Sequence, residues 1–233
     1  MHKWHSACLI SLYQYQPHTV FILSSIFQKE GEKKKFLLFL CAVMLVFGMT
    51  GTAGALALST VDGAWTGTTG GYNVNYLSGV AVAYGNSLED QVRWGRPTNQ
   101  GQSGLGFTGI APPDSFFDIN EIFEIGQLRH FNAPIYAGSN ATAAFLTISM
   151  SFSDPDGLDG VFDFTFEIDE TPNEPGPPAS DDIITFPSSY TPETFDINGV
   201  DYTLQLLGFG DSSDDLIDSF SSPEGGTNAT RLW

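Results

Sequence analysis

The sequence has 233 residues, with 9 basic and 27 acidic side chains and a formal net charge of −18. All five lysines lie within the first 57 positions, so residues 58–233 hold four arginines against 25 acidic residues, a net charge of −21. This excess argues against binding to nucleic acid or to an anionic membrane surface, because both need cationic patches. Both cysteines, Cys8 and Cys41, also precede residue 58, so no disulfide holds the remainder together.

The N-terminal region has the three parts of a secretory signal peptide. Lysines at 33–35 precede an uncharged apolar segment over 36–47, and small residues follow. This pattern predicts a signal-peptide helix within residues 33–57, cleaved after Ala55 or Ala57. A retained membrane anchor is the alternative, but the apolar segment is shorter than the roughly 20 residues of a membrane span. In both cases the remainder is predicted to be exported, and it meets a membrane only through an uncleaved leader.

Residues 1–32 precede this leader without a clear pattern. A start codon assigned too early is one interpretation, and a long cytoplasmic n-region is the other. The chain is therefore predicted to consist of residues 1–32, a signal peptide over 33–57 and one domain over 58–233. Those 176 of the 233 residues are enough for one sandwich-sized core.

Residues 58–233 have the pattern of an all-β protein. Short alternating or aromatic-rich runs lie between clusters of Gly, Pro, Asn and Asp, without a helical period over 11 or more residues. Strands are predicted over 59–66, 80–84, 91–94, 103–109, 116–125, 143–152, 162–168, 183–186, 195–197, 200–206 and 227–233. The dipeptide Asn198-Gly199 suits a type I′ hairpin turn between two of them. We predict a single antiparallel β-sandwich, jelly-roll-like, preceded by the signal-peptide helix.

The stretch 123–135 contains the only histidine after residue 57, His130. His130 and Asn132 are two residues apart, so in a strand both point to one side, together with Leu128. Pro134 restricts the residue before it to extended backbone and ends the pairing there. An imidazole and an amide beside such a break can satisfy backbone groups. We therefore predict structural roles for five residues: Gly126, Leu128, His130, Asn132 and Pro134.

No catalytic site is predicted. A hydrolase triad lacks a nucleophile for His130, because Ser103 does not lie in a Gly-x-Ser-x-Gly turn. Catalytic zinc usually takes two or three histidines or cysteines, which argues against it here. Glu167 and Asp169 project from one face of a strand and could act in a glycosidase, but a solvated outer face explains them more simply.

The sequence suggests one cofactor, calcium. Asp154, Asp156 and Asp159 surround Gly157 and Gly160, and carboxylate oxygens are ligands that calcium prefers. The spacing departs from that of an EF-hand loop, so an ordinary Asp/Gly turn is the alternative.

Five segments, taken in order, resemble a family of exported bacterial domains, labelled choice-of-anchor K or the Thr-His-x-Asn group. They cover residues 93–97, 103–109, 125–135, 169–173 and 198–209. The resemblance implies a surface module that is tethered by varied C-terminal devices, commonly a PEP-CTERM sorting signal, and that has no established molecular role. Arg129 stands where the family usually has Thr. No such signal follows Trp233, which implies a truncated chain or an untethered protein.

The expected function is that of an exported, non-enzymatic module of the cell surface or extracellular matrix, which contacts extracellular polysaccharide or surface proteins. The alternative, from another class, is a secreted carbohydrate-binding or carbohydrate-active protein that resembles a glycoside hydrolase. The scarcity of catalytic His, Cys and basic residues favours the first.

Overall fold

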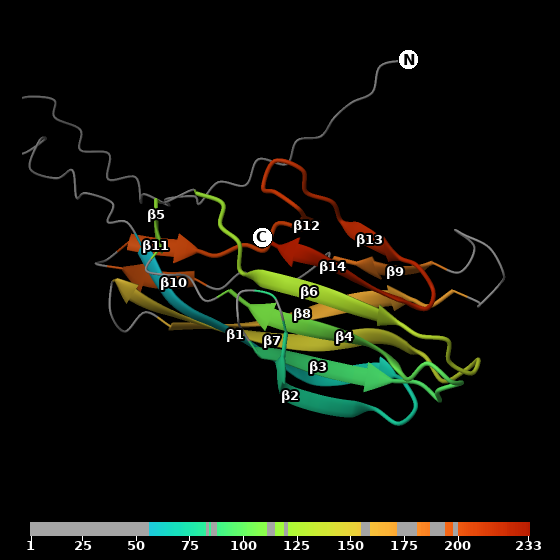
Figure 1. The fold of residues 1–233 in the computed structure, drawn as a ribbon. Coiled ribbons are helices and arrows are strands. Elements are labelled where there is room, and N and C mark those ends of the chain that lie inside the picture. Colours follow the sequence, from blue (N-terminus) through green and yellow to red (C-terminus); the bar gives the residue numbers. More distant parts are fainter. Residues whose placement is uncertain are drawn as a thin grey trace, which may run out of the picture.

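The computed structural model describes residues 56–82, 84, 88–110, 115–118, 121–154, 159–171, 181–186, 194–197 and 200–233. The regular structure in these ranges is β-strand, arranged in two six-stranded antiparallel sheets and one two-stranded hairpin (Figure 1). The predicted all-β sandwich is confirmed. None of the described residues form a helix that is long and apolar enough to cross a lipid bilayer. Residues 33–55 of the predicted signal peptide lie outside the described residues, whereas Leu56 and Ala57, placed at its end, belong to strand β1 (Leu56–Gly70) instead.

The first sheet, sheet A, has the order β13-β9-β8-β7-β1-β5. Its strands are β1 (Leu56–Gly70), β5 (Ser115–Phe117), β7 (Ala141–Asp154), β8 (Asp159–Asp169), β9 (Asp182–Thr185) and β13 (Ser219–Ser222). Strand β8 alternates between exposed polar and buried apolar residues over its whole length. Phe162, Phe164, Phe166 and Ile168 therefore face the core, as their spacing predicted.

The second sheet, sheet B, has the order β12-β14-β6-β4-β3-β2. Its strands are β2 (Asn75–Ala81), β3 (Leu88–Trp94), β4 (Ser103–Gly109), β6 (Gly126–Asn132), β12 (Phe209–Gly210) and β14 (Gly226–Leu232). The hairpin pairs β10 (Thr194–Ile197) with β11 (Val200–Thr203). This pairing was predicted, although its Asn198-Gly199 turn lies outside the described residues.

The core lies between the two sheets. Sheet B contributes Trp94, Leu105 and Leu128, and sheet A contributes residues such as Leu146 and Ile148. An aromatic cluster at one side is centred on Phe209 of β12, which is fully buried. The ring centroids of Phe220, Phe186 and Phe166 lie 5.2, 5.4 and 6.0 Å from that of Phe209.

Two strand predictions differ from the structure. The strand expected over 116–125 is wrong, because β5 covers only Ser115–Phe117 and residues 121–125 form no strand. Ile125 is instead held by a backbone bond from its N–H to the carbonyl of Leu232. The strand expected over 80–84 lies earlier, as β2, whose residues are mostly exposed and carry no alternating pattern. It is an edge strand, and a strand with little burial leaves no periodic signal in the sequence.

Candidate functional site

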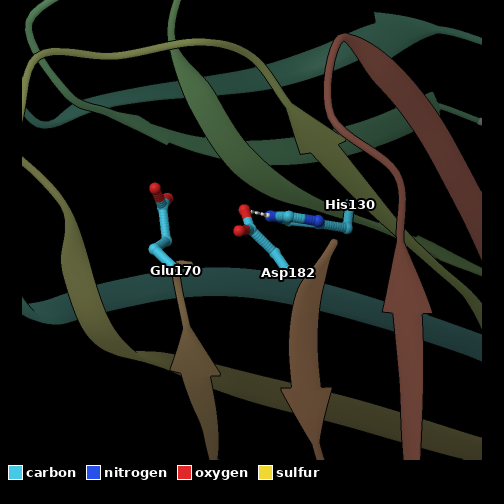
Figure 2. Close-up of side chains that lie close together, drawn as sticks. All are labelled: His130, Glu170 and Asp182. Atoms are coloured by element: carbon cyan, nitrogen blue, oxygen red, sulfur yellow. Dashed lines mark ion pairs between the residues drawn. The ribbon is translucent and has the colours of Figure 1, made fainter. Parts of the chain in front are cut away.

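A cluster of polar side chains lies between the sheets at one end of the sandwich. His130 is on β6 of sheet B, Asp182 begins β9 of sheet A, and Glu170 directly follows β8. Figure 2 shows the imidazole of His130 and the carboxylate of Asp182 pointing at each other, with Glu170 beside them. His130 and Asp182 are 0% and 1% exposed. We call these three residues the inter-sheet cluster.

Local sequence periodicity places each member of the inter-sheet cluster. On β6, Leu128, His130 and Asn132 point inward, while the residues between them point outward. On β8 the even-numbered residues are buried and point inward. Glu170 is the next even-numbered residue after the strand, so it lies on the same inward-facing side. Asp182 and the fully buried Ile184 are two residues apart on β9, so both side chains point to the inner face of the sheet.

The hydrogen bonds of the inter-sheet cluster are incomplete. The Nε2 atom of His130 lies 3.8 Å from Oδ2 of Asp182, which is too long for a hydrogen bond. Oδ1 of Asp182 accepts a bond from the Thr171 N–H at 3.0 Å, and Oε1 of Glu170 accepts one from Nε1 of Trp94 at 2.6 Å. Within the described residues, both ring nitrogens of His130 and Oδ2 of Asp182 have no hydrogen-bond partner.

Two further unpartnered atoms lie nearby. Ser222 pairs directly with Asp182 in the ladder between β13 and β9, so their side chains share a face. Buried Oγ of Ser222 and buried Oε1 of Glu224 find no hydrogen-bond partner in the described part of the chain. Asn132 is satisfied, because its Nδ2 donates to the Ser222 carbonyl at 2.7 Å.

Burial controls the charge states of the inter-sheet cluster. It raises the pKa of Asp182 to about 8, with a further contribution from the charge of Glu170. Burial also raises the pKa of Glu170 to about 7, and it lowers the pKa of His130 to about 3, with Arg93 adding to the effect. Near pH 7 the imidazole is therefore neutral, and its contact with Asp182 is not an ion pair. Buried polar groups without partners are costly, so this arrangement needs an explanation.

The outer face of sheet B gathers three of the four arginines, Arg93, Arg129 and Arg231. Arg129 binds the fully buried carboxylate of Glu89 through two bonds of 2.5 and 2.6 Å. Gly106 makes room for this pair, because a Cβ there would lie 2.5 Å from the carboxyl carbon of Glu89. The arginine that replaces the threonine expected from the resemblance thus has a partner of its own.

A cavity of about 320 Å³ opens beside Arg93, and we call it the Arg93 cavity. It is lined by Arg93, Gln100, Gln102, Phe131, Asn132, Ala133, Gly225, Gly226 and Thr227. Arg93 donates to Oε1 of Gln91 at 2.9 Å and to the Gln102 carbonyl at 3.2 Å, and its guanidinium lies 3.3 Å from the Phe131 ring centre. Burial lowers the pKa of Arg93 to about 10, so it remains charged at neutral pH. Among the described residues, no carboxylate lies within salt-bridge distance of Arg93.

The other residues that the sequence singled out lie apart from both sites. Gly126 begins β6, where a Cβ would lie 2.4 Å from the Thr108 carbonyl, and the Pro134 carbonyl accepts a bond from Oγ1 of Thr98. Asp154 and Asp159 are exposed at facing ends of β7 and β8, whereas Asp156 lies outside the described residues. Glu167 and Asp169 are exposed on β8.

The chain matches no protein-family model and no curated protein. The resemblance to choice-of-anchor K domains therefore remains a prediction that rests on five segments of the sequence.

Proposed function

We propose that this protein is an exported, non-enzymatic binding module of the cell surface or extracellular matrix, and that the Arg93 cavity holds a carboxylate-bearing polysaccharide. One observation carries the proposal. Arg93 is a charged, half-buried side chain that lines the cavity, and no carboxylate among the described residues forms a salt bridge with it, although the charge of Glu89 acts on it. Arg129 and Arg231 differ, because each has a glutamate partner.

The lining of the Arg93 cavity matches the chemistry of an acidic sugar. A planar guanidinium binds carboxylates through two parallel bonds. Gln100 and Thr227 add an amide and a hydroxyl group, which can donate to or accept from sugar hydroxyls, whereas the amide of Gln102 is held by Asn73, Asn75 and Gly95. The net charge of −21 on residues 58–233 opposes an anionic ligand. At physiological salt, however, repulsion from exposed carboxylates is screened beyond about 8 Å. The nearby charge of Arg93 therefore determines whether an anionic group binds in the cavity.

The buried carboxyl groups support a binding role over hydrolysis. Glu170 and Asp182 have raised pKa values, as a glycosidase acid requires, but they lie between the sheets and are held by Trp94 and Thr171. Asp182 is 1% exposed and Glu170 only partly exposed, so a glycosidic bond would have to enter the core to reach Asp182. Release of reducing sugars from any polysaccharide that the protein binds would favour the alternative, a carbohydrate-active enzyme.

We expect Arg93→Gln to weaken binding to polygalacturonate or alginate about tenfold or more, because the carboxylate of the sugar loses its cationic partner. Titration calorimetry and glycan arrays measure this effect, with neutral dextran as the control ligand. Arg231→Gln is the matched control variant, since Arg231 lies on the same face but pairs with Glu124 at 3.6 Å. The proposal would be contradicted if Arg93→Gln bound the acidic polysaccharides as tightly as wild type does. It would also be contradicted if the wild-type protein bound dextran more tightly than the acidic polysaccharides.

Signal peptidase is expected to cleave after Ala55 rather than after Ala57. Leu56 and Ala57 belong to β1 and are only 6% and 2% exposed. Cleavage after Ala57 would remove the buried Leu56 side chain, which is worth roughly 1.5–3 kcal/mol. N-terminal sequencing of exported protein should therefore begin at Leu56. A mature chain that begins at Leu58 would rule this out.

A further inference from the structure

We infer that His130, Glu170 and Asp182 together hold one divalent transition-metal ion, zinc or manganese, which ties sheet A to sheet B. The site is built from one imidazole nitrogen on sheet B and two carboxylates at strand ends of sheet A. None of these three residues lines the Arg93 cavity, and the inference does not depend on the proposed function.

The geometry suits a shared ion. One possible ligand atom from each residue can be chosen so that all three lie within 4.8 Å of one another. An ion with bonds of about 2.0–2.2 Å places its ligand atoms roughly 3–4.4 Å apart. The 3.8 Å between Nε2 of His130 and Oδ2 of Asp182 falls in that range, whereas it is too long for a direct hydrogen bond.

The unpartnered atoms point to the same conclusion. His130 is 0% exposed, yet neither ring nitrogen has a hydrogen bond within the described residues, and Oδ2 of Asp182 faces it without one. Native proteins rarely leave such groups unsatisfied. An ion between them would satisfy Nε2 and Oδ2 together. Ser222 and Glu224 place two more unpartnered oxygens in this region.

The mixture of nitrogen and oxygen ligands favours a transition metal over calcium or magnesium. Calcium and magnesium favour oxygen ligands alone, whereas zinc and manganese accept imidazole together with carboxylates. Outer hydrogen bonds already orient two of the ligands, because Trp94 donates to Glu170 and the Thr171 N–H donates to Asp182. Since His130 and Asp182 are almost fully buried between the sheets, the role that fits this ion is structural.

Metal content and thermal stability test the inference. We expect protein stripped with chelator to take up one zinc or manganese ion per chain, measured by mass spectrometry of the metal. A hundredfold excess over Kd should raise the melting temperature by about 5–10 °C, because the ion binds only the folded state. Calcium should give little shift. Cobalt should bind at the same site, and the bound ion should show the visible absorption expected for cobalt with nitrogen and oxygen ligands in low symmetry.

Asp182→Asn isolates the site. The amide keeps the shape and the acceptor for Thr171, so the fold should survive, while affinity for zinc falls about a hundredfold or more. Asp169→Asn is the matched control, since Asp169 is an exposed carboxylate one residue before Glu170. His130→Gln should abolish the cobalt spectrum. The inference fails if wild type takes up neither zinc nor manganese, or if Asp169→Asn weakens binding as much as Asp182→Asn does.

Discussion

Arg129→Met is expected to lower the free energy of unfolding by about 3–5 kcal/mol, because it leaves a buried carboxylate without its cation. The side chain of Glu89 is 0% exposed and receives two bonds from Arg129. Gln91 is its other side-chain donor among the described residues, at 2.6 Å. The one amide of Gln91 cannot replace the two bonds of the guanidinium, so the charge of Glu89 stays buried without compensation. Urea denaturation measures the loss.

Two further variants separate the buried charge from the loss of packing. The double variant Glu89→Leu/Arg129→Met removes both charges and should recover most of the lost stability. Arg231→Met breaks a pair whose side chains are 46% and 14% exposed, so it should cost less than about 1 kcal/mol. If Arg129→Met costs no more than Arg231→Met, the buried pair does not stabilise the outer face of sheet B.

Phe209→Ala is expected to lower the free energy of unfolding by about 3–5 kcal/mol. Phe209 is fully buried, and its ring meets Phe186 and Phe220 edge to face. Truncation removes the central ring of this aromatic cluster and leaves a cavity that its neighbours cannot fill without moving. The same urea experiment gives the value.

Phe220→Ala is the matched control, because Phe220 packs against the same cluster but is only partly buried. Its loss should cost clearly less than that of Phe209, and Phe209→Leu should also cost less because it keeps most of the volume. If Phe209→Ala and Phe220→Ala lowered the free energy of unfolding equally, Phe209 would not be the main stabilising residue of the aromatic cluster.

Elements with a strong local period or a recognisable turn sequence could be predicted, including the short β10–β11 hairpin, whereas β12 and β13 were missed. Strand β8 alternates over its whole length, and β4 was predicted with its observed bounds. Strands β12 and β13 have two and four residues, so neither is long enough for a periodic pattern. Their position comes from pairing with β14 and β9, which are distant in sequence or separated by loops.

The candidate sites show the same limit. His130 was identified because it is the only histidine after residue 57. Glu170 and Asp182 were missed as its neighbours, although the alternation of β8 extends to Glu170 and that of β9 includes Asp182. Their meeting with His130 depends on how the sheets stack, and no local pattern contains that information. The same holds for Arg129 and Glu89, which meet across β4.

Strand β14, with residues 226–232, enters sheet B between β12 and β6 and pairs with residues 126–132 along its whole length. Sheet B therefore cannot form completely until residues 226–232 have been synthesised and can reach β6. Pairing between such distant segments is slow, on the order of milliseconds to seconds, because the loop must close before the contacts repay its entropy. A segment that pairs late remains unfolded for longer after its synthesis. It also exposes β6 to other chains for longer, so this strand is where misassembly would begin.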